Sequence, residues 1–182
     1  MIRRFVLCAA IVQALIVPAS AHRLDEYLQA TTIDVVKDHV TLHLYLTPGV
    51  EVAEVVLANI DTDSDGRISQ IEQETYAGHV RDDLTLGVDG KTLPLRLVSS
   101  SFPTTEAMEG GVGEILLVYR AELPSDGTRR TLTFVNRHKK AIAVYMVNAL
   151  VRGNPDIRVT RQTRSAGQAA YEMEFTERTL PQ

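Results

Sequence analysis

One acidic stretch, residues 61–72 (DTDSDGRISQIE), constrains this chain more than any other part of its sequence. Aspartates recur at every second position at its start, a glycine follows in the middle, and a glutamate closes it. Calcium is a hard cation that takes about seven oxygen ligands, and such alternation lets a tight loop supply them. The spacing is that of an EF-hand calcium loop. The predicted ligand residues are Asp61, Asp63, Asp65, Arg67, Ser69 and Glu72.

Each position in this loop has a chemical reason. Gly66 permits the left-handed turn at the centre, which a residue with a Cβ resists. Arg67 is expected to bind through its backbone carbonyl, Ser69 directly or through a water, and Glu72 through both carboxylate oxygens. An ordinary solvated turn accounts for the aspartates and the glycine. It does not account for the apolar Ile68, the hydroxyl after it and the closing glutamate, so a calcium loop is the preferred interpretation.

Helical patterns flank the loop. Upstream, apolar residues recur at helical spacing over residues 50–60, and Thr47-Pro48 is expected to provide the N-cap and the first helical residue. Downstream, the same period runs from residue 71 to residue 84, with Gly78 as a weak point. EF-hands usually occur in pairs, but no second loop of this spacing occurs in the sequence. A single site must be braced by the rest of the domain, by a degenerate partner or by a second copy.

The first 21 residues predict a secretory signal peptide. Arg3 and Arg4 form its basic start, residues 5–17 its apolar run, and residues 19–21 (ASA) its cleavage site. The apolar run is shorter than the ~20 residues that a membrane-spanning helix needs. The one cysteine, Cys8, lies inside this segment, so the mature chain leaves the cytoplasm but uses no disulfides. We therefore expect a secreted, periplasmic or extracellular protein of the bacterial envelope.

Outside the helical patterns, apolar and polar residues alternate as in half-buried β-strands. Asp89-Gly90 is a two-residue hairpin signal, Pro94 places the returning strand at a sheet edge, and residues 99–113 are expected to form a loop. About nine short strands separated by turns predict a mainly β fold, an antiparallel β-sandwich of Ig-like type. The expected strands cover residues 31–37, 40–46, 84–88, 93–97, 115–121, 131–135, 142–150, 157–163 and 171–176.

The predicted organisation is a signal peptide over residues 1–21 and one sandwich domain over residues 22–182, with the helix–loop–helix inserted at about residues 48–83. The pI of about 5.7 and the predicted export argue against a nucleic-acid partner. The sequence contains no nucleophile elbow, no zinc-protease motif and no phosphate-binding glycine loop. An enzyme is therefore not predicted, and no catalytic residue is nominated.

Four stretches also carry a family resemblance: the calcium loop and residues 21–30 (AHRLDEYLQA), 93–102 (LPLRLVSSSF) and 145–148 (YMVN). Together they resemble the exported region that precedes the membrane spans in bacterial proteins of the HupE/UreJ type. This resemblance implies an envelope domain with an envelope or membrane-permease protein as its partner. The chain departs from that pattern because it reaches Gln182 without a transmembrane segment. A freestanding version or a separately encoded membrane half is expected, and a transport role is not carried over.

The alternative function is transition-metal binding at the new N-terminus. Cleavage after Ala21 would leave His22 first, and its α-amine and imidazole can together chelate Cu(II) or Ni(II). This arrangement resembles the N-terminal histidine of periplasmic copper-binding β-sandwiches. A third ligand would have to come from another histidine, and none of them lies in a short ligand motif. The candidates are His39, His43, His79 and His138.

Overall fold

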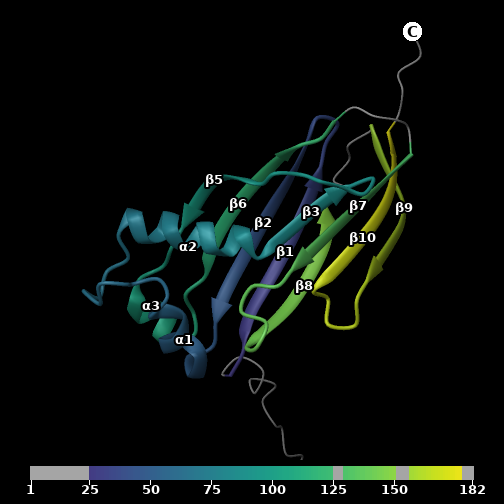
Figure 1. Ribbon diagram of the computed structural model, residues 1–182. Coiled ribbons are helices and arrows are strands. Elements are labelled where there is room, and N and C mark those ends of the chain that lie inside the picture. Colours follow the sequence, from purple (N-terminus) through teal and green to yellow (C-terminus); the bar gives the residue numbers. More distant parts are fainter. Residues whose placement is uncertain (1–24, 125–128, 151–155, 178–182) are drawn as a thin grey trace, which may run out of the picture.

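The computed structural model describes residues 25–124, 129–150 and 156–177 (Figure 1). The predicted signal peptide and His22 lie outside these residues. The described part is mainly β, as the alternating patterns predict, and none of its helices is long and apolar enough to cross a membrane. In chain order the elements are β1 (Tyr27–Val35), β2 (His39–Pro48), α1 (Val50–Leu57), α2 (Gln70–Asp82), β3 (Leu84–Val88), β4 (Lys91–Thr92), β5 (Arg96–Ser101), α3 (Thr105–Glu109), β6 (Ile115–Glu122), β7 (Arg129–Asn136), β8 (Ala143–Leu150), β9 (Ile157–Arg164) and β10 (Ala170–Glu177).

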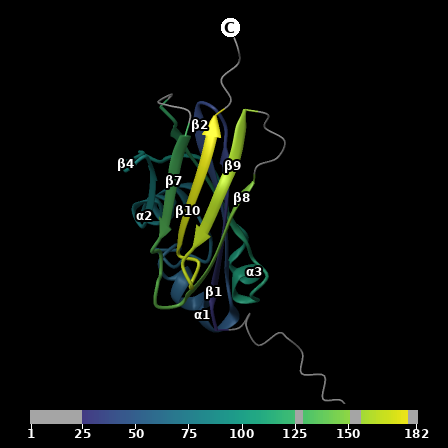
Figure 2. The same ribbon diagram turned by 90° about the vertical axis from the view of Figure 1, so that its right-hand side faces the viewer.

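The strands form two five-stranded sheets that lie one in front of the other in Figure 2. One has the order β5-β6-β2-β1-β8 and the other β4-β3-β7-β10-β9. Every pairing is antiparallel except that of β1 with β8, which is parallel and sets Leu28 opposite Val144. The prediction of purely antiparallel sheets is therefore wrong at this edge. The chain crosses from β7 in one sheet to β8 in the other, and residue alternation carries no information on strand direction.

The core lies between the two sheets. Burial alternates along the strands, so that one side chain in two faces inward, as in β1 and β10. Leu42 and Leu44 of one sheet and Phe134 and Phe175 of the other are fully buried in a single apolar cluster. Burying one such side chain contributes about 1.5–3 kcal/mol, so this shared cluster is what holds the sheets together.

The three helices gather on one side of the sheets (Figure 1). Helix α1 packs against α3 and β2, and α2 packs against β3 and β5. The buried face of α1 carries Val52 and Val56, and that of α2 carries Tyr76 and Val80. The loop between α1 and α2 therefore projects from helices that are both anchored on the sheets.

The start of α1 differs from its prediction. Thr47 and Pro48 belong to β2, where Pro48 lies opposite Tyr27 of β1, and the N-cap of α1 is Gly49. Strand pairing with β1 thus extends through the proline, and the helix begins only after it. The cap preference of threonine was outweighed by sheet pairing with a distant residue.

The hairpin at Asp89-Gly90 is confirmed, since both residues have positive φ, of 53° and 78°. The strand predicted at residues 93–97 is wrong. Strand β4 stops at Thr92, and after Pro94 the chain crosses to the other sheet as β5. Both β4 and β5 are edge strands, and Pro94 lies between them in neither strand.

The loop predicted over residues 99–113 is also wrong. Strand β5 runs through Ser101, and the short helix α3 follows. Thr104 caps α3 by accepting a hydrogen bond from the Ala107 N–H at 3.3 Å, and Met108 is its one buried residue. A helix this short shows too little apolar periodicity to be recognised in a sequence. The strand predicted over residues 84–88 is present with those bounds as β3, and the other predicted strands are present with shifted ends.

Candidate metal centre

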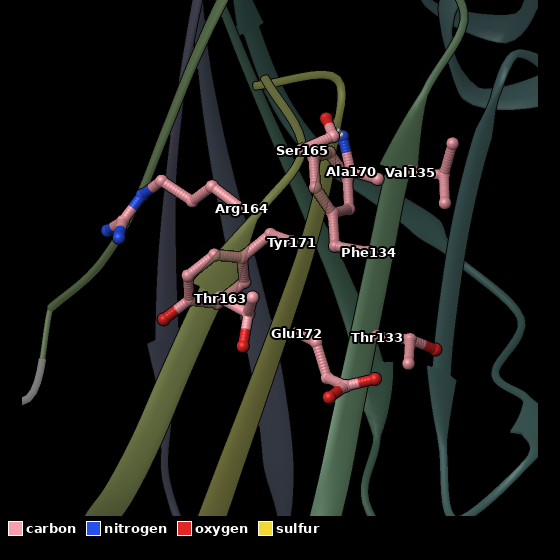
Figure 3. A pocket seen from close by; sticks show the side chains of 9 residues that line it. All are labelled: Thr133, Phe134, Val135, Thr163, Arg164, Ser165, Ala170, Tyr171 and Glu172. Carbon is pink, nitrogen blue, oxygen red and sulfur yellow. Dashed lines mark hydrogen bonds between the residues drawn. The ribbon is translucent and has the colours of Figure 1, made fainter. Parts of the chain in front are cut away.

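One concave region lies over β7, β9 and β10 and encloses about 380 Å³ (Figure 3). Two of its polar side chains, those of Arg164 and Tyr171, are already engaged within the chain. The Nε of Arg164 donates to the Val147 carbonyl at 2.8 Å, and its guanidinium carbon lies 5.1 Å from the centre of the Tyr171 ring. The Tyr171 hydroxyl in turn donates to Gln162 at 2.9 Å. These contacts tie β8 and β10 to β9, so we assign this region a role in packing.

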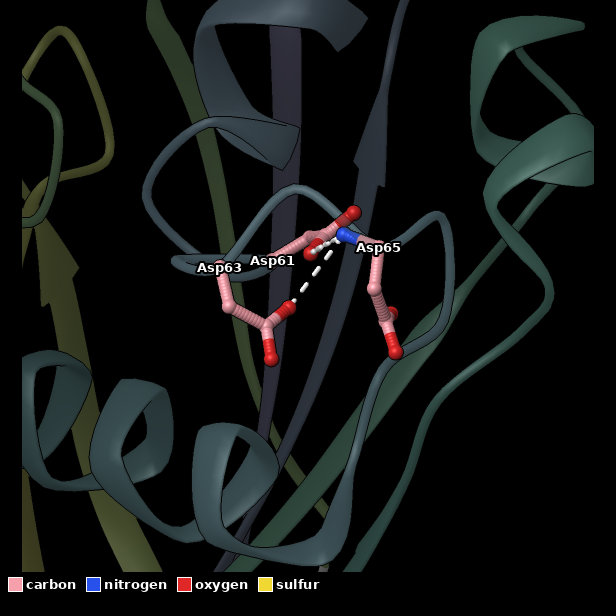
Figure 4. Close-up of side chains that lie close together, drawn as sticks. All are labelled: Asp61, Asp63 and Asp65. Carbon is pink, nitrogen blue, oxygen red and sulfur yellow. Dashed lines mark hydrogen bonds between the residues drawn. The ribbon is translucent and has the colours of Figure 1, made fainter.

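The acidic loop between α1 and α2 brings three of the predicted ligand residues together (Figure 4). One carboxylate oxygen from each of Asp61, Asp63 and Asp65 lies within 4.8 Å of the others. Asp61 is the most buried of the three, and the other two are exposed. Among the described residues, no other group of three or more His, Cys, Asp or Glu side chains gathers in this way. The loop is therefore the candidate metal centre.

Backbone N–H groups hold these carboxylates close in spite of their mutual repulsion. The Asp65 N–H donates to Asp61 Oδ1 at 3.1 Å and to Asp63 Oδ1 at 3.2 Å. The Gly66 N–H donates to Asp61 Oδ2 at 3.0 Å, and the Arg67 N–H donates to Asp65 Oδ1 at 2.8 Å. The peptide groups thus converge on the side-chain oxygens and preorganise the loop around them.

The turn depends on two residues with left-handed backbone conformation. Gly66 has φ of +80° and Ser64 has φ of 58°. A Cβ on Gly66 would meet no atom within 4 Å, so the glycine is required by its backbone angle and not by lack of space. This is the role that its place at the centre of the loop predicts.

Glu72 is buried at the base of the loop and connects its two ends. It accepts hydrogen bonds from the Thr62 N–H at 2.6 Å and from the Ser69 N–H and hydroxyl, both at 2.9 Å. The Ser69 bonds, followed by those from Thr62, lower the pKa of Glu72 to about 2. Ser69 and Glu72 together form a capping box at the start of α2. The two predicted ligands are therefore adjacent, although Glu72 is not among the carboxylates that converge.

Negative charges crowd around the Asp63 carboxylate. The hydrogen bond from the Asp65 N–H lowers the pKa of Asp63, but partial loss of hydration and the negative charges of Asp65 and Glu72 outweigh it and raise the pKa overall. The negative charges within the loop therefore repel one another, and a cation among them would relieve that repulsion.

Helix α3 braces the loop from the same domain. The Thr105 hydroxyl donates to the Gly66 carbonyl at 3.1 Å. Ile68 packs against the core, and its carbonyl accepts a hydrogen bond from the Gln73 amide at 3.1 Å. Of the three braces that the sequence left open, these contacts correspond to the first, support from the rest of the domain.

Helix α2 is tied to the sheets by buried polar contacts that sequence reasoning missed. The Tyr76 hydroxyl lies 2.8 Å from that of Tyr27 and 3.0 Å from Nε2 of His138. The Tyr119 hydroxyl donates to the Ala77 carbonyl at 2.7 Å. The two residues of each contact lie 42 or more positions apart along the chain, so no local motif could have indicated these contacts.

The histidines proposed as a third copper or nickel ligand are spread over the fold. His39 pairs with Asp38 at 2.7 Å at the start of β2, His43 is half-buried on β2, and His79 is exposed on α2. His138 is buried, and its two ring nitrogens already contact Tyr76 and Asp83. His22 itself lies outside the described residues.

Comparisons add no relative to this picture: no family model matches the chain, and no curated protein or solved structure gives a significant match. The HupE/UreJ resemblance stays a prediction.

Proposed function

We propose that this chain is an exported calcium-binding module, an Ig-like β-sandwich with one EF-hand, α1–loop–α2, inserted between β2 and β3. The observation that carries the proposal is the convergence of three carboxylates, within 4.8 Å, in a loop of EF-hand spacing. The proposed ligands are the side chains of Asp61, Asp63, Asp65, Ser69 and Glu72 and the carbonyl of Arg67.

The donor set favours calcium over other ions. All the proposed ligand atoms are oxygens, which suit hard cations, whereas copper and nickel prefer nitrogen ligands. Magnesium demands a small octahedral shell and keeps several waters, while a closing bidentate glutamate brings the ligand number to about seven. A divalent ion would also offset the repulsion that raises the pKa of Asp63.

Glu72 is the residue through which the ion acts on α2. In the proposed bound state, the Glu72 carboxylate gives up its hydrogen bonds from Thr62 and Ser69 and binds the ion instead. Because Tyr76 and Ala77 already fix α2 to the sheets, ion binding orders the loop more than it moves the helix. We therefore assign calcium a structural role in a binding module, and not the role of a switch.

Location and partner rest on the sequence alone. The predicted signal peptide supports export to the periplasm or the cell exterior. The HupE/UreJ resemblance supports an envelope or membrane-permease protein as the partner. No catalytic role is proposed.

Calorimetric titration of the purified protein with calcium tests this proposal. Binding of one ion per chain with a Kd of about 10⁻⁴ to 10⁻³ M is expected, as for other extracellular sites. Glu72→Gln should weaken binding by at least about tenfold, because it removes charge and one ligand oxygen. The matched control is Glu74→Gln, an exposed position on the same helix, which should change the Kd little. Equal affinity in the wild type and Glu72→Gln would refute the assignment.

A further inference from the structure

A cleft of about 760 Å³ lies where β1 and β8 meet the turn that follows α3. Its volume falls within the range of about 300–1,000 Å³ that is typical of ligand pockets. Leu28, Val112 and Val144 give it apolar walls, and Glu26 and Glu114 also line it. The acidic loop contributes no residue to this cleft, so it is a separate feature of the domain.

Val112 is held outward at the edge of the cleft. Its side chain is 79% exposed, although a valine gains free energy when it is buried. The N–H groups of Val112 and Gly113 both donate to the Ala107 carbonyl, at 3.1 and 2.8 Å. A Cβ on Gly113 would lie 2.7 Å from the Met108 nitrogen, so the turn is packed tightly onto α3. A rigid turn therefore presents this valine to solvent.

The apolar surface continues along the sheet. Leu28 of β1 and Val144 of β8 are direct partners in the parallel register, and Leu28 is 37% exposed. Met146, two residues further along β8 on the same face, is 44% exposed. A strip of exposed apolar side chains on rigid strands, next to a presented valine, is typical of a binding surface.

The charges around the cleft have one sign. Glu26 and Glu114 line it, and no Lys, Arg or His does so. Among the described residues, neither glutamate takes part in an ion pair. Two carboxylates beside an apolar surface repel acidic ligands and anionic membranes and attract a ligand that is both apolar and cationic.

We propose that this cleft binds a peptide segment of a partner protein in which an apolar side chain is flanked by lysine or arginine. The apolar side chain contacts Leu28, Val112 and Val144, and the basic residues pair with Glu26 and Glu114. The proposal uses no calcium ligand, so it stands or falls separately from the metal centre.

A tryptophan peptide provides the probe, because the chain itself contains no tryptophan to obscure its fluorescence. Acetyl-Lys-Trp-Lys-amide should show saturable binding in calcium-containing buffer. Acetyl-Glu-Trp-Glu-amide should bind at least about tenfold more weakly, since each of its charges is repelled. Equal binding of the two peptides, or no saturable binding of the lysine peptide, would overturn the proposal.

Variants locate the site. Val112→Ser and Glu114→Gln should each weaken binding of the lysine peptide by about two- to fivefold, the range for exposed contacts. The control is Val98→Ser, a 53% exposed valine on β5 at the opposite edge of the same sheet, which should leave binding unchanged. Equal losses in Val98→Ser and Val112→Ser would contradict the assignment. So would sedimentation evidence that the surface around Val112 is covered by a second copy of the chain.

Discussion

The Tyr76 hydroxyl lies 3.0 Å from Nε2 of His138, and this contact joins the helix that follows the acidic loop to the turn between β7 and β8. The other ring nitrogen of His138 lies 2.8 Å from Asp83, at the end of the same helix. The His138 carbonyl accepts hydrogen bonds from Gln29 and from the Tyr145 hydroxyl. The helix is thus fixed by partners that do not depend on any ion.

The stability of the domain should fall as the pH drops below about 6.5. Burial lowers the pKa of His138 in the folded state, although the hydrogen bond to Asp83 opposes this shift. The unfolded chain, whose histidines titrate near pH 6.5, therefore binds more protons than the folded chain in this range. Stability rises with pH wherever that is so, and it is lost on acidification.

Melting temperatures measured between about pH 7.5 and pH 5 test this linkage. His138→Gln should flatten the pH dependence, whereas His79→Gln, an exposed position on α2, should leave it unchanged. The same slope in the wild type and His138→Gln would show that another group is responsible.

Replacing Gly66 or Gly78 by alanine should change the free energy of unfolding in opposite directions. Gly66→Ala forces a Cβ into a left-handed turn of φ +80° and should destabilise the domain by about 1–2 kcal/mol. Gly78→Ala lies within α2 with open space around it and should stabilise the domain by about 0.4–1 kcal/mol. Urea unfolding of both variants provides the comparison. A stabilising Gly66→Ala would mean that the loop does not need its left-handed turn.

Removing calcium should lower the melting temperature without unfolding the sheets. An ion that binds only the folded chain adds about 2.7 kcal/mol at a hundredfold excess over its Kd, and a chelator removes this term. The apolar core extends over both sheets and does not depend on the carboxylate cluster, so the β-sheet circular dichroism signal should persist. Complete unfolding on chelation would place the ion within the cooperative core.

Local patterns predicted the features that depend on neighbouring residues. The alternation through Leu42 and Leu44 predicted an inward face of β2. Asp89-Gly90 predicted the hairpin that joins β3 to β4. The aspartate spacing placed Asp61, Asp63 and Asp65 among the six predicted ligands, and the carboxylates of these three residues lie together in the structure. These features follow from backbone periods and turn angles, which a sequence displays directly.

The structural features that the sequence did not reveal depend on contacts between residues far apart along the chain. Pro48 lies in β2 because Tyr27 pairs with it, and the parallel direction of β8 follows from a crossover between sheets. The contact of Tyr76 with His138 spans 62 positions. The capping bonds of Glu72 were missed for a different reason, since one glutamate can serve either as a ligand or as a cap.

The most direct test of the metal centre follows the Gly66 amide by NMR during a calcium titration. That N–H donates to Asp61 Oδ2 at 3.0 Å, so an ion on the same carboxylate must polarise it. We predict a large shift of the Gly66 resonance that saturates at one calcium per chain, together with smaller shifts of its loop neighbours. The sheet amides should move little. A Gly66 resonance that stays in place while calcium is added, or that moves without saturating, would contradict a calcium site in this loop.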